Sequence, residues 1–133
     1  MKPTLILLVL SVAASLVGCT ASNAAPTKEP QGGAIYIDSA DLLIMESYPV
    51  QISLHIVGNL PTPCHEFQFS VSQPDAKNRI YVAAWSESDP TAICAQVLQF
   101  FEENVGIPMA GVADGTYSVW LNGELVGEFN YPG

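Results

Sequence analysis

Cys64, His65 and Glu66 stand in a row and offer a thiol, an imidazole and a carboxylate. These are the side chains that a cysteine nucleophile with its base, or a zinc site, would use. Successive side chains of a β-strand point to opposite faces, so His65 would face away from both of its neighbours. His55 is the only other histidine of the chain. A disulfide-bonded cysteine with two polar neighbours explains the same letters, so we expect no metal site and no cofactor.

Two pairs of carboxylates are the other candidates for chemistry. Glu102 and Glu103 are adjacent, and Glu87 lies close to Asp89. A glycosidase needs two carboxyl groups that face each other across a cleft, whereas adjacent residues of a strand diverge. We interpret these acids as solvated edges and assign no catalytic residue. The sequence therefore predicts a protein that is not an enzyme.

Three aromatic side chains are the candidates for ligand binding. Tyr81 and Trp85 alternate with the apolar residues of segment 80–84, and Trp120 alternates with those of segment 117–121. If the apolar faces point inward, all three aromatics project outward, where a rigid sheet can present them to sugar rings or to a protein partner. The alternatives are that loops or the ambiguous segment 93–107 cover them, or that the inner and outer faces are reversed.

Most of the chain after the first 31 residues shows the period-two pattern of half-buried strands. The expected strands and strand-like apolar runs are 34–38, 42–45, 50–56, 67–71, 80–85, 116–121 and 125–131. The segment 93–105 is ambiguous. An alternating strand that includes Phe101 and Val105 is favoured, because every neighbour is a strand, and one short helix near 92–103 is the alternative.

Asn122-Gly123 between two alternating runs is a strong signal for a β-hairpin. A two-residue turn would place Leu125 opposite Trp120, which lies outside the apolar face. A three-residue turn would instead place Leu121 opposite Leu125 and pair apolar residues with each other. We predict the three-residue turn, because strand register follows the buried face.

About seven short strands with turns roughly every 8–12 residues are typical of a β-sandwich. The run GTYSVWLNG at 115–123 resembles the late-strand G-x-Y-x-V-x-x-N-G pattern of secreted immunoglobulin-like bacterial domains. The fold that this resemblance implies is all-β, a single immunoglobulin-like β-sandwich. The inter-sheet Cys-Trp-Cys spacing of immunoglobulin domains is not reproduced, so the strand topology stays open.

The first 19 residues resemble the signal sequence of bacterial lipoproteins. Lys2 precedes an apolar run, 5–17, of about 13 residues, which is shorter than the roughly 20 that a spanning helix needs and suits a signal-peptide core. Leu16-Val17-Gly18-Cys19 then resembles the lipobox. This implies cleavage before Cys19 and acylation of that residue, with palmitate as a typical chain. A plain secretory signal with an incidental cysteine is the alternative.

The lipoprotein resemblance implies a location in the bacterial cell envelope, facing outside the cytoplasm. Thr20 stands where Asp would favour the inner membrane, so the family rule implies the outer membrane in a diderm and the outer face of the cell membrane in a monoderm. With Cys19 lipidated, Cys64 and Cys94 remain as an even pair in an oxidising compartment. We expect a disulfide between them, since a metal or redox pair would need ligand spacing that the sequence lacks.

These resemblances divide the chain into three parts: a cleaved signal peptide (1–18), a lipidated cysteine with a flexible tether (19–31) and a β-sandwich domain (32–133). The tether has no large apolar residue with which to build a core. After cleavage, the chain has three basic residues and 13 acidic ones. Such a chain is a poor partner for nucleic acid, and we expect no contact with it.

Taken together, the sequence predicts a lipid-anchored extracytoplasmic binding module whose partner is a surface protein or a glycan. The membrane itself is a partner through the lipid on Cys19. A surface protease inhibitor that presents a loop such as 59–63, or a small structural protein of the envelope, are the alternatives.

Overall fold

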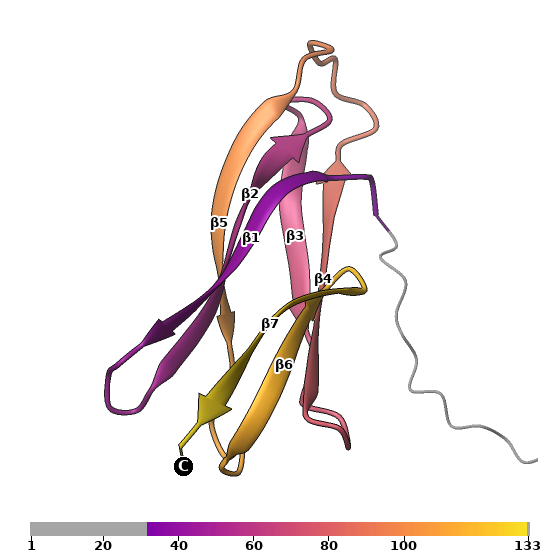
Figure 1. Ribbon diagram of the computed structural model, residues 1–133. Coiled ribbons are helices and arrows are strands. Elements are labelled where there is room, and N and C mark those ends of the chain that lie inside the picture. The colour runs from indigo at the N-terminus through magenta and orange to yellow at the C-terminus, as the bar shows by residue number, and fades with distance from the viewer. Residues whose placement is uncertain (1–31, 133) are drawn as a thin grey trace, which may run out of the picture.

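Figure 1 shows the computed structural model, which describes residues 32–132 as two layers of β-strands. The strands are β1 (Tyr36–Met45), β2 (Gln51–Leu60), β3 (His65–Val71), β4 (Arg79–Ser88), β5 (Gln99–Ile107), β6 (Gly115–Leu121) and β7 (Glu124–Tyr131). No residue of the described range is helical. The all-β prediction is therefore confirmed, and the short helix considered near 92–103 is wrong.

Residues 1–31 lie outside the described range, together with the predicted signal peptide, the lipidation site Cys19 and the tether. Within residues 32–132, no helix is long and apolar enough to cross a membrane.

The strands form one sheet of three, in the order β1-β2-β5, and one sheet of four, in the order β3-β4-β6-β7. Neighbouring strands are antiparallel, except that β4 and β6 run parallel. The chain leaves β4 for the other sheet, runs back through β5, and returns beside β4 as β6. Alternation in the sequence predicts which face of a strand is buried, but it carries no information on which strand lies beside it.

The core lies between the two sheets and consists of the inward-facing residues of both. Phe67 of β3 stacks on Phe101 of β5 across the layers, with ring centroids 5.0 Å apart. Tyr117 and Phe129 stack at 5.8 Å on neighbouring strands, and the Tyr117 hydroxyl donates a hydrogen bond to the Ala113 carbonyl. Each fully buried side chain of this kind contributes about 1.5–3 kcal/mol relative to exposure.

The ambiguous segment divides into a loop and a strand. Phe101, Val105 and Ile107 of β5 are buried in the core, whereas Ile93 and Val97 before it are exposed. An isolated short helix is marginal in water without an apolar face to pack, and the residues before Gln99 have no core beneath them. The strand that we favoured is therefore present as β5, and the apolar residues on one face of it are buried in the core.

The hairpin between β6 and β7 has a two-residue turn, so the predicted three-residue turn is wrong. Leu121 lies opposite Glu124 and Trp120 opposite Leu125, as Asn122-Gly123 alone would indicate. Both turn residues have positive φ, 48° and 90°, as a type I′ turn requires. The register then shifts by a β-bulge between Val119 and Trp120, which places Phe129 opposite Tyr117 on the core face.

Cys64 and Cys94 form the predicted disulfide, with their Cα atoms 6.0 Å apart. Cys64 lies in the connection from β2 to β3, and Cys94 lies in the connection from β4 to β5. Each of these connections carries the chain from one sheet to the other. The disulfide therefore joins two inter-sheet connections at the same end of the sandwich.

Candidate binding surface

The outer face of the four-stranded sheet carries the three aromatics predicted from the sequence. Ile80, Val82 and Ala84 are buried, so the assignment of the inner face of β4 is correct. Tyr81, Trp85 and Trp120 are half-buried on the opposite face. Segment β5 belongs to the other sheet and does not cover them.

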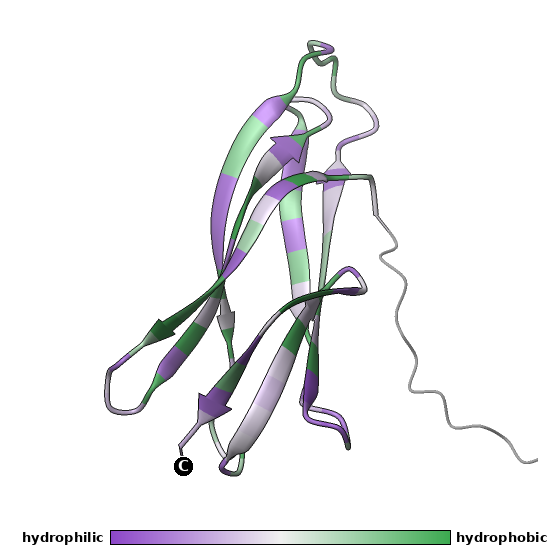
Figure 2. Cartoon of the chain, in the orientation of Figure 1, coloured by the Kyte–Doolittle hydropathy of each residue, from purple (hydrophilic) through white to green (hydrophobic). Residues whose placement is uncertain are grey.

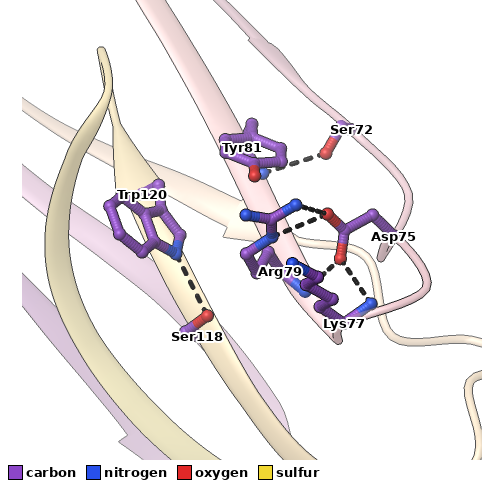
Figure 3. Close-up of polar contacts among 7 residues, drawn as sticks. All are labelled: Ser72, Asp75, Lys77, Arg79, Tyr81, Ser118 and Trp120. Carbon is purple, nitrogen blue, oxygen red and sulfur yellow. Dashed lines mark hydrogen bonds and ion pairs between the residues drawn. The ribbon is translucent and has the colours of Figure 1, made fainter. Parts of the chain in front are cut away.

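Tyr81 and Trp120 lie side by side at the centre of this face. They are register partners across the parallel pair β4–β6, with ring centroids 6.5 Å apart and planes inclined at 40°. The Trp120 indole N–H donates to the Ser118 hydroxyl at 3.1 Å (Figure 3). That hydrogen bond fixes the orientation of the indole and leaves its ring carbon atoms to pack against Tyr81.

Leu125 extends this surface onto β7, and sequence reasoning missed it. The two-residue turn places Leu125 directly opposite Trp120, and 52% of its surface is exposed. The signal was present, because the Asn122-Gly123 turn predicts this pairing by itself. We call Tyr81, Trp120 and Leu125 the aromatic patch.

Arg79 and Asp75 border the patch on its polar side. The Arg79 guanidinium carbon lies 5.6 Å from the centre of the Tyr81 ring, within the range of a cation–π interaction. The Asp75 carboxylate accepts from Arg79 Nε and Nη2, each at 2.7 Å (Figure 3). The hydrogen bond from the Arg79 side chain, followed by those from the Arg79 and Lys77 backbone N–H groups, lowers the pKa of Asp75 to about 2.

Trp85 lies further along β4 and is not part of this patch. Its indole N–H donates to Glu87 at 3.1 Å, and Gly32 lies against its ring. A Cβ added to Gly32 would collide with the Trp85 indole, so the backbone of Gly32 packs directly on that side chain. The structure thus brings together two of the three predicted aromatics and places the third under Gly32.

The Cys64-His65-Glu66 row does not form a reactive group. Cys64 is in the disulfide, and His65 Nδ1 lies 2.8 Å from the Thr62 hydroxyl. His55 is on the other sheet, with its Nε2 3.4 Å from Glu102 and its Nδ1 3.1 Å from Asn104 Oδ1. Among residues 32–132, no group of three His, Cys, Asp or Glu side chains could hold a metal ion.

The paired carboxylates also have separate surroundings. Glu102 lies near His55, while Glu103 is the register partner of the inward-facing Ile56. Asp89 accepts from the hydroxyl and the backbone N–H of Thr91, which lowers the pKa of its carboxyl. No two of these acids face each other across a cleft in the part of the chain that the structure describes.

A groove of about 440 Å³ opens at the end of the sandwich away from the disulfide. It is bounded by the beginning of β2, the end of β5 and Tyr131 at the end of β7. Of its lining residues, only Tyr131 has a titratable side chain. The groove therefore offers apolar contact, and it lacks a nucleophile paired with a base.

The two packed sheets and their seven strands define a small β-sandwich protein. More particularly, the chain belongs to the family of the ORF11 beta-sandwich domain, whose family model matches residues 54–131. The match runs from within β2 to the end of β7. No curated protein and no solved structure matches the chain.

Proposed function

We propose that the protein is a lipid-anchored, extracytoplasmic binding module that holds a surface protein or a glycan on its aromatic patch. The anchor and the location rest on the Leu16-Val17-Gly18-Cys19 motif and on the apolar run before it. A disulfide between Cys64 and Cys94 is consistent with an oxidising compartment.

The single observation that carries the binding role is the pairing of Tyr81 and Trp120 on adjacent central strands. Large aromatic side chains that are half-buried in a rigid sheet lose little conformational freedom on binding, and they supply much of the energy of recognition surfaces. Leu125 widens the apolar area, and Arg79 and Asp75 provide a polar rim. A flat apolar centre with a polar border is the usual anatomy of an interaction site.

A binding role fits the described residues better than the alternatives do. The protease-inhibitor alternative requires a presented loop at 59–63, but Leu60 and Thr62 are buried. An enzyme would need convergent polar groups in a cleft, and the groove of the sandwich is lined mainly by apolar side chains and backbone. We therefore propose a non-catalytic function.

The test is affinity capture from the cell's own envelope extract and culture supernatant with the full mature chain as bait. We expect Trp120→Ala to weaken retention of the partner by roughly 30-fold or more, the effect of losing a central hot-spot side chain of about 2 kcal/mol. Leu125→Glu, at a half-exposed position, should act in the same direction without disturbing the core. Glycan partners are detected by competition with free sugars.

Tyr36→Ala is the matched control, because Tyr36 is also about half exposed but lies on the other sheet. It should leave capture unchanged, and every variant should still unfold cooperatively in urea, so that a loss of capture is not a loss of folding. If Trp120→Ala and Leu125→Glu retain the same partner as the parent chain, the aromatic patch is not the site. Mass spectrometry of the mature chain that finds no acyl chain on Cys19 would contradict the lipid anchor.

A further inference from the structure

The connection between β4 and β5 projects beyond the ends of both sheets (Figure 1). We call residues 89–98 the tip loop. A turn in which Asp89 accepts from Thr91 and Ala92 opens it, and the Cys64–Cys94 disulfide holds its middle. The tip loop is thus fixed by covalent and polar contacts.

The tip loop exposes apolar side chains that the fold does not use. Ile93 is fully exposed, and Val97, Leu98 and the adjacent Phe100 are each more than half exposed. None of the four belongs to the hydrophobic core or packs against it. Figure 2 shows apolar stretches on this loop, and the sequence from 90 to 101 contains no charged residue in a chain that is otherwise acidic.

The chain enters the sandwich at the same end. Gly33 forms an isolated bridge with Ser86, with its N–H 2.7 Å from the Ser86 carbonyl, and β4 ends at Ser88 where the tip loop begins. Only residues 20–31 separate Gly32 from Cys19. Even fully extended, such a segment reaches about 40 Å, so a lipid on Cys19 would hold the sandwich within that distance of the bilayer and would tie it there by this end.

We propose that the tip loop docks into the interfacial layer of the same bilayer that holds the lipid on Cys19. This inference rests on the lipid anchor of the proposed function. Apolar side chains gain free energy on leaving water for the acyl boundary, and the absence of charge from 90 to 101 removes the main cost of that transfer. The lipid supplies attachment, and the tip loop supplies orientation.

The carboxylates near the loop determine which lipid surface fits. Glu66 and Glu87 are exposed register partners beside the tip loop, and the exposed Asp89 begins the loop. These charges are repelled by an anionic surface and tolerate a zwitterionic one. Docking should therefore be stronger on phosphatidylcholine vesicles than on vesicles that contain an anionic lipid.

Docking in this way would give the molecule a fixed direction. The tip loop and the segment at Gly33 would face the bilayer, and the turn between β1 and β2, where Tyr48 is fully exposed, would point away from it (Figure 1). The aromatic patch, on the side of the sandwich, would remain open to a partner.

The first experiment uses the lipidated full chain in phosphatidylcholine vesicles with brominated acyl chains, which quench tryptophan at the acyl boundary. Leu98→Trp should show more quenching than the parent chain, which has its own two tryptophans. Tyr48→Trp should show no more quenching than the parent chain. Both positions are exposed, so each variant should keep the parent's unfolding midpoint. Equal quenching at the two positions, or none at 98 while the chain stays bound, would overturn the proposal.

The second experiment separates the tip loop from the anchor. A Cys19→Ser chain should still float with phosphatidylcholine vesicles at high lipid concentration. Adding Ile93→Ser/Leu98→Ser to that chain should lower its affinity for the vesicles by about tenfold or more, and adding Tyr48→Ser instead is the control. An unchanged vesicle affinity of the Ile93→Ser/Leu98→Ser chain would overturn the docking of the tip loop and leave the lipid anchor standing. Equal flotation of the parent chain and the Cys19→Ser chain at every lipid concentration would overturn the anchor alone. Self-association through Ile93 and Leu98 without lipid would assign the loop to a second copy of the chain instead.

Discussion

Asn122 acts as both a turn residue and a strand-pairing residue. Its positive φ fits the turn between β6 and β7, and its side chain pairs with the backbone of Ala84 on β4. Oδ1 accepts from the Ala84 N–H at 2.9 Å, and Nδ2 donates to the Ala84 carbonyl at 3.0 Å. The side-chain amide thus continues the parallel pairing of β4 and β6 past the point where β6 turns away.

We predict that Asn122→Gly lowers the free energy of unfolding by about 1–3 kcal/mol, because glycine keeps the positive φ but removes two hydrogen bonds to a buried backbone. Asn122→Ala should cost more, since it also forces a residue with a Cβ into the left-handed region. Urea denaturation of the three chains measures both differences. Equal stability of Asn122→Gly and the parent would mean that Ala84 finds other partners.

The residues of the aromatic patch show how far sequence reasoning reaches at this scale. Alternation identified the outward direction of Tyr81 and Trp120, because the buried residues around them have period two. It did not predict that the two rings meet, since that requires β4 and β6 to be neighbours. It also could not predict the contact of Gly32 with Trp85, because a glycine outside the alternating strands carries no packing signal of its own.

At the scale of the element, the β6–β7 hairpin contains two rules that conflict in the sequence. The Asn122-Gly123 turn demands a two-residue connection, whereas the apolar face demands a register that this connection does not supply. A β-bulge between Val119 and Trp120 satisfies both, since one extra residue on β7 returns Phe129 to its place opposite Tyr117. Our sequence prediction did not consider a bulge, and it therefore rejected the two-residue turn.

The turn before β4 is the element that responds most clearly to acid. The hydrogen bonds from Arg79 and Lys77 favour the ionised form of Asp75 and lower its pKa from 3.8 to about 2 in the folded chain. A carboxyl whose pKa is depressed by folding adds stability above its unfolded pKa and loses it as the pH falls toward the folded one. The contribution of Asp75 should therefore disappear between about pH 4 and pH 2.

We predict that Asp75→Asn makes the free energy of unfolding depend less steeply on pH between 4 and 2, while the curves run parallel above pH 5. Urea midpoints collected across this range provide the measurement. Some acid dependence should remain in the variant, because Asp89 also has a lowered pKa through its hydrogen bonds with Thr91. Identical slopes for the two chains below pH 4 would contradict the role given to the Asp75–Arg79 contact.

At the scale of the molecule, the number of strands and their faces could be read from alternation, but their arrangement could not. The parallel pair β4–β6 exists because β5 carries the chain through the other sheet, and no local pattern encodes that excursion. The disulfide was predictable as a pair from the lipoprotein resemblance and the cysteine count. That it joins two inter-sheet connections depends on the same unpredicted topology.

The Cys64–Cys94 bridge therefore bears on the whole sandwich, because it closes a loop that contains β3 and β4 and returns to the point where the chain crosses between layers. In the chain-entropy model, closing a loop of about 30 residues stabilises a fold by roughly 3–4 kcal/mol. We expect reduction to lower the free energy of unfolding by that order, and Cys64→Ser/Cys94→Ser to match the reduced parent. Urea denaturation with and without reductant provides the comparison, and the double variant should not respond to reductant.

The contradicting result is a loss that is confined to the tip loop, seen as faster amide exchange at 89–98 with an unchanged urea midpoint. It would mean that the bridge orders the loop alone and that the two sheets hold together without it.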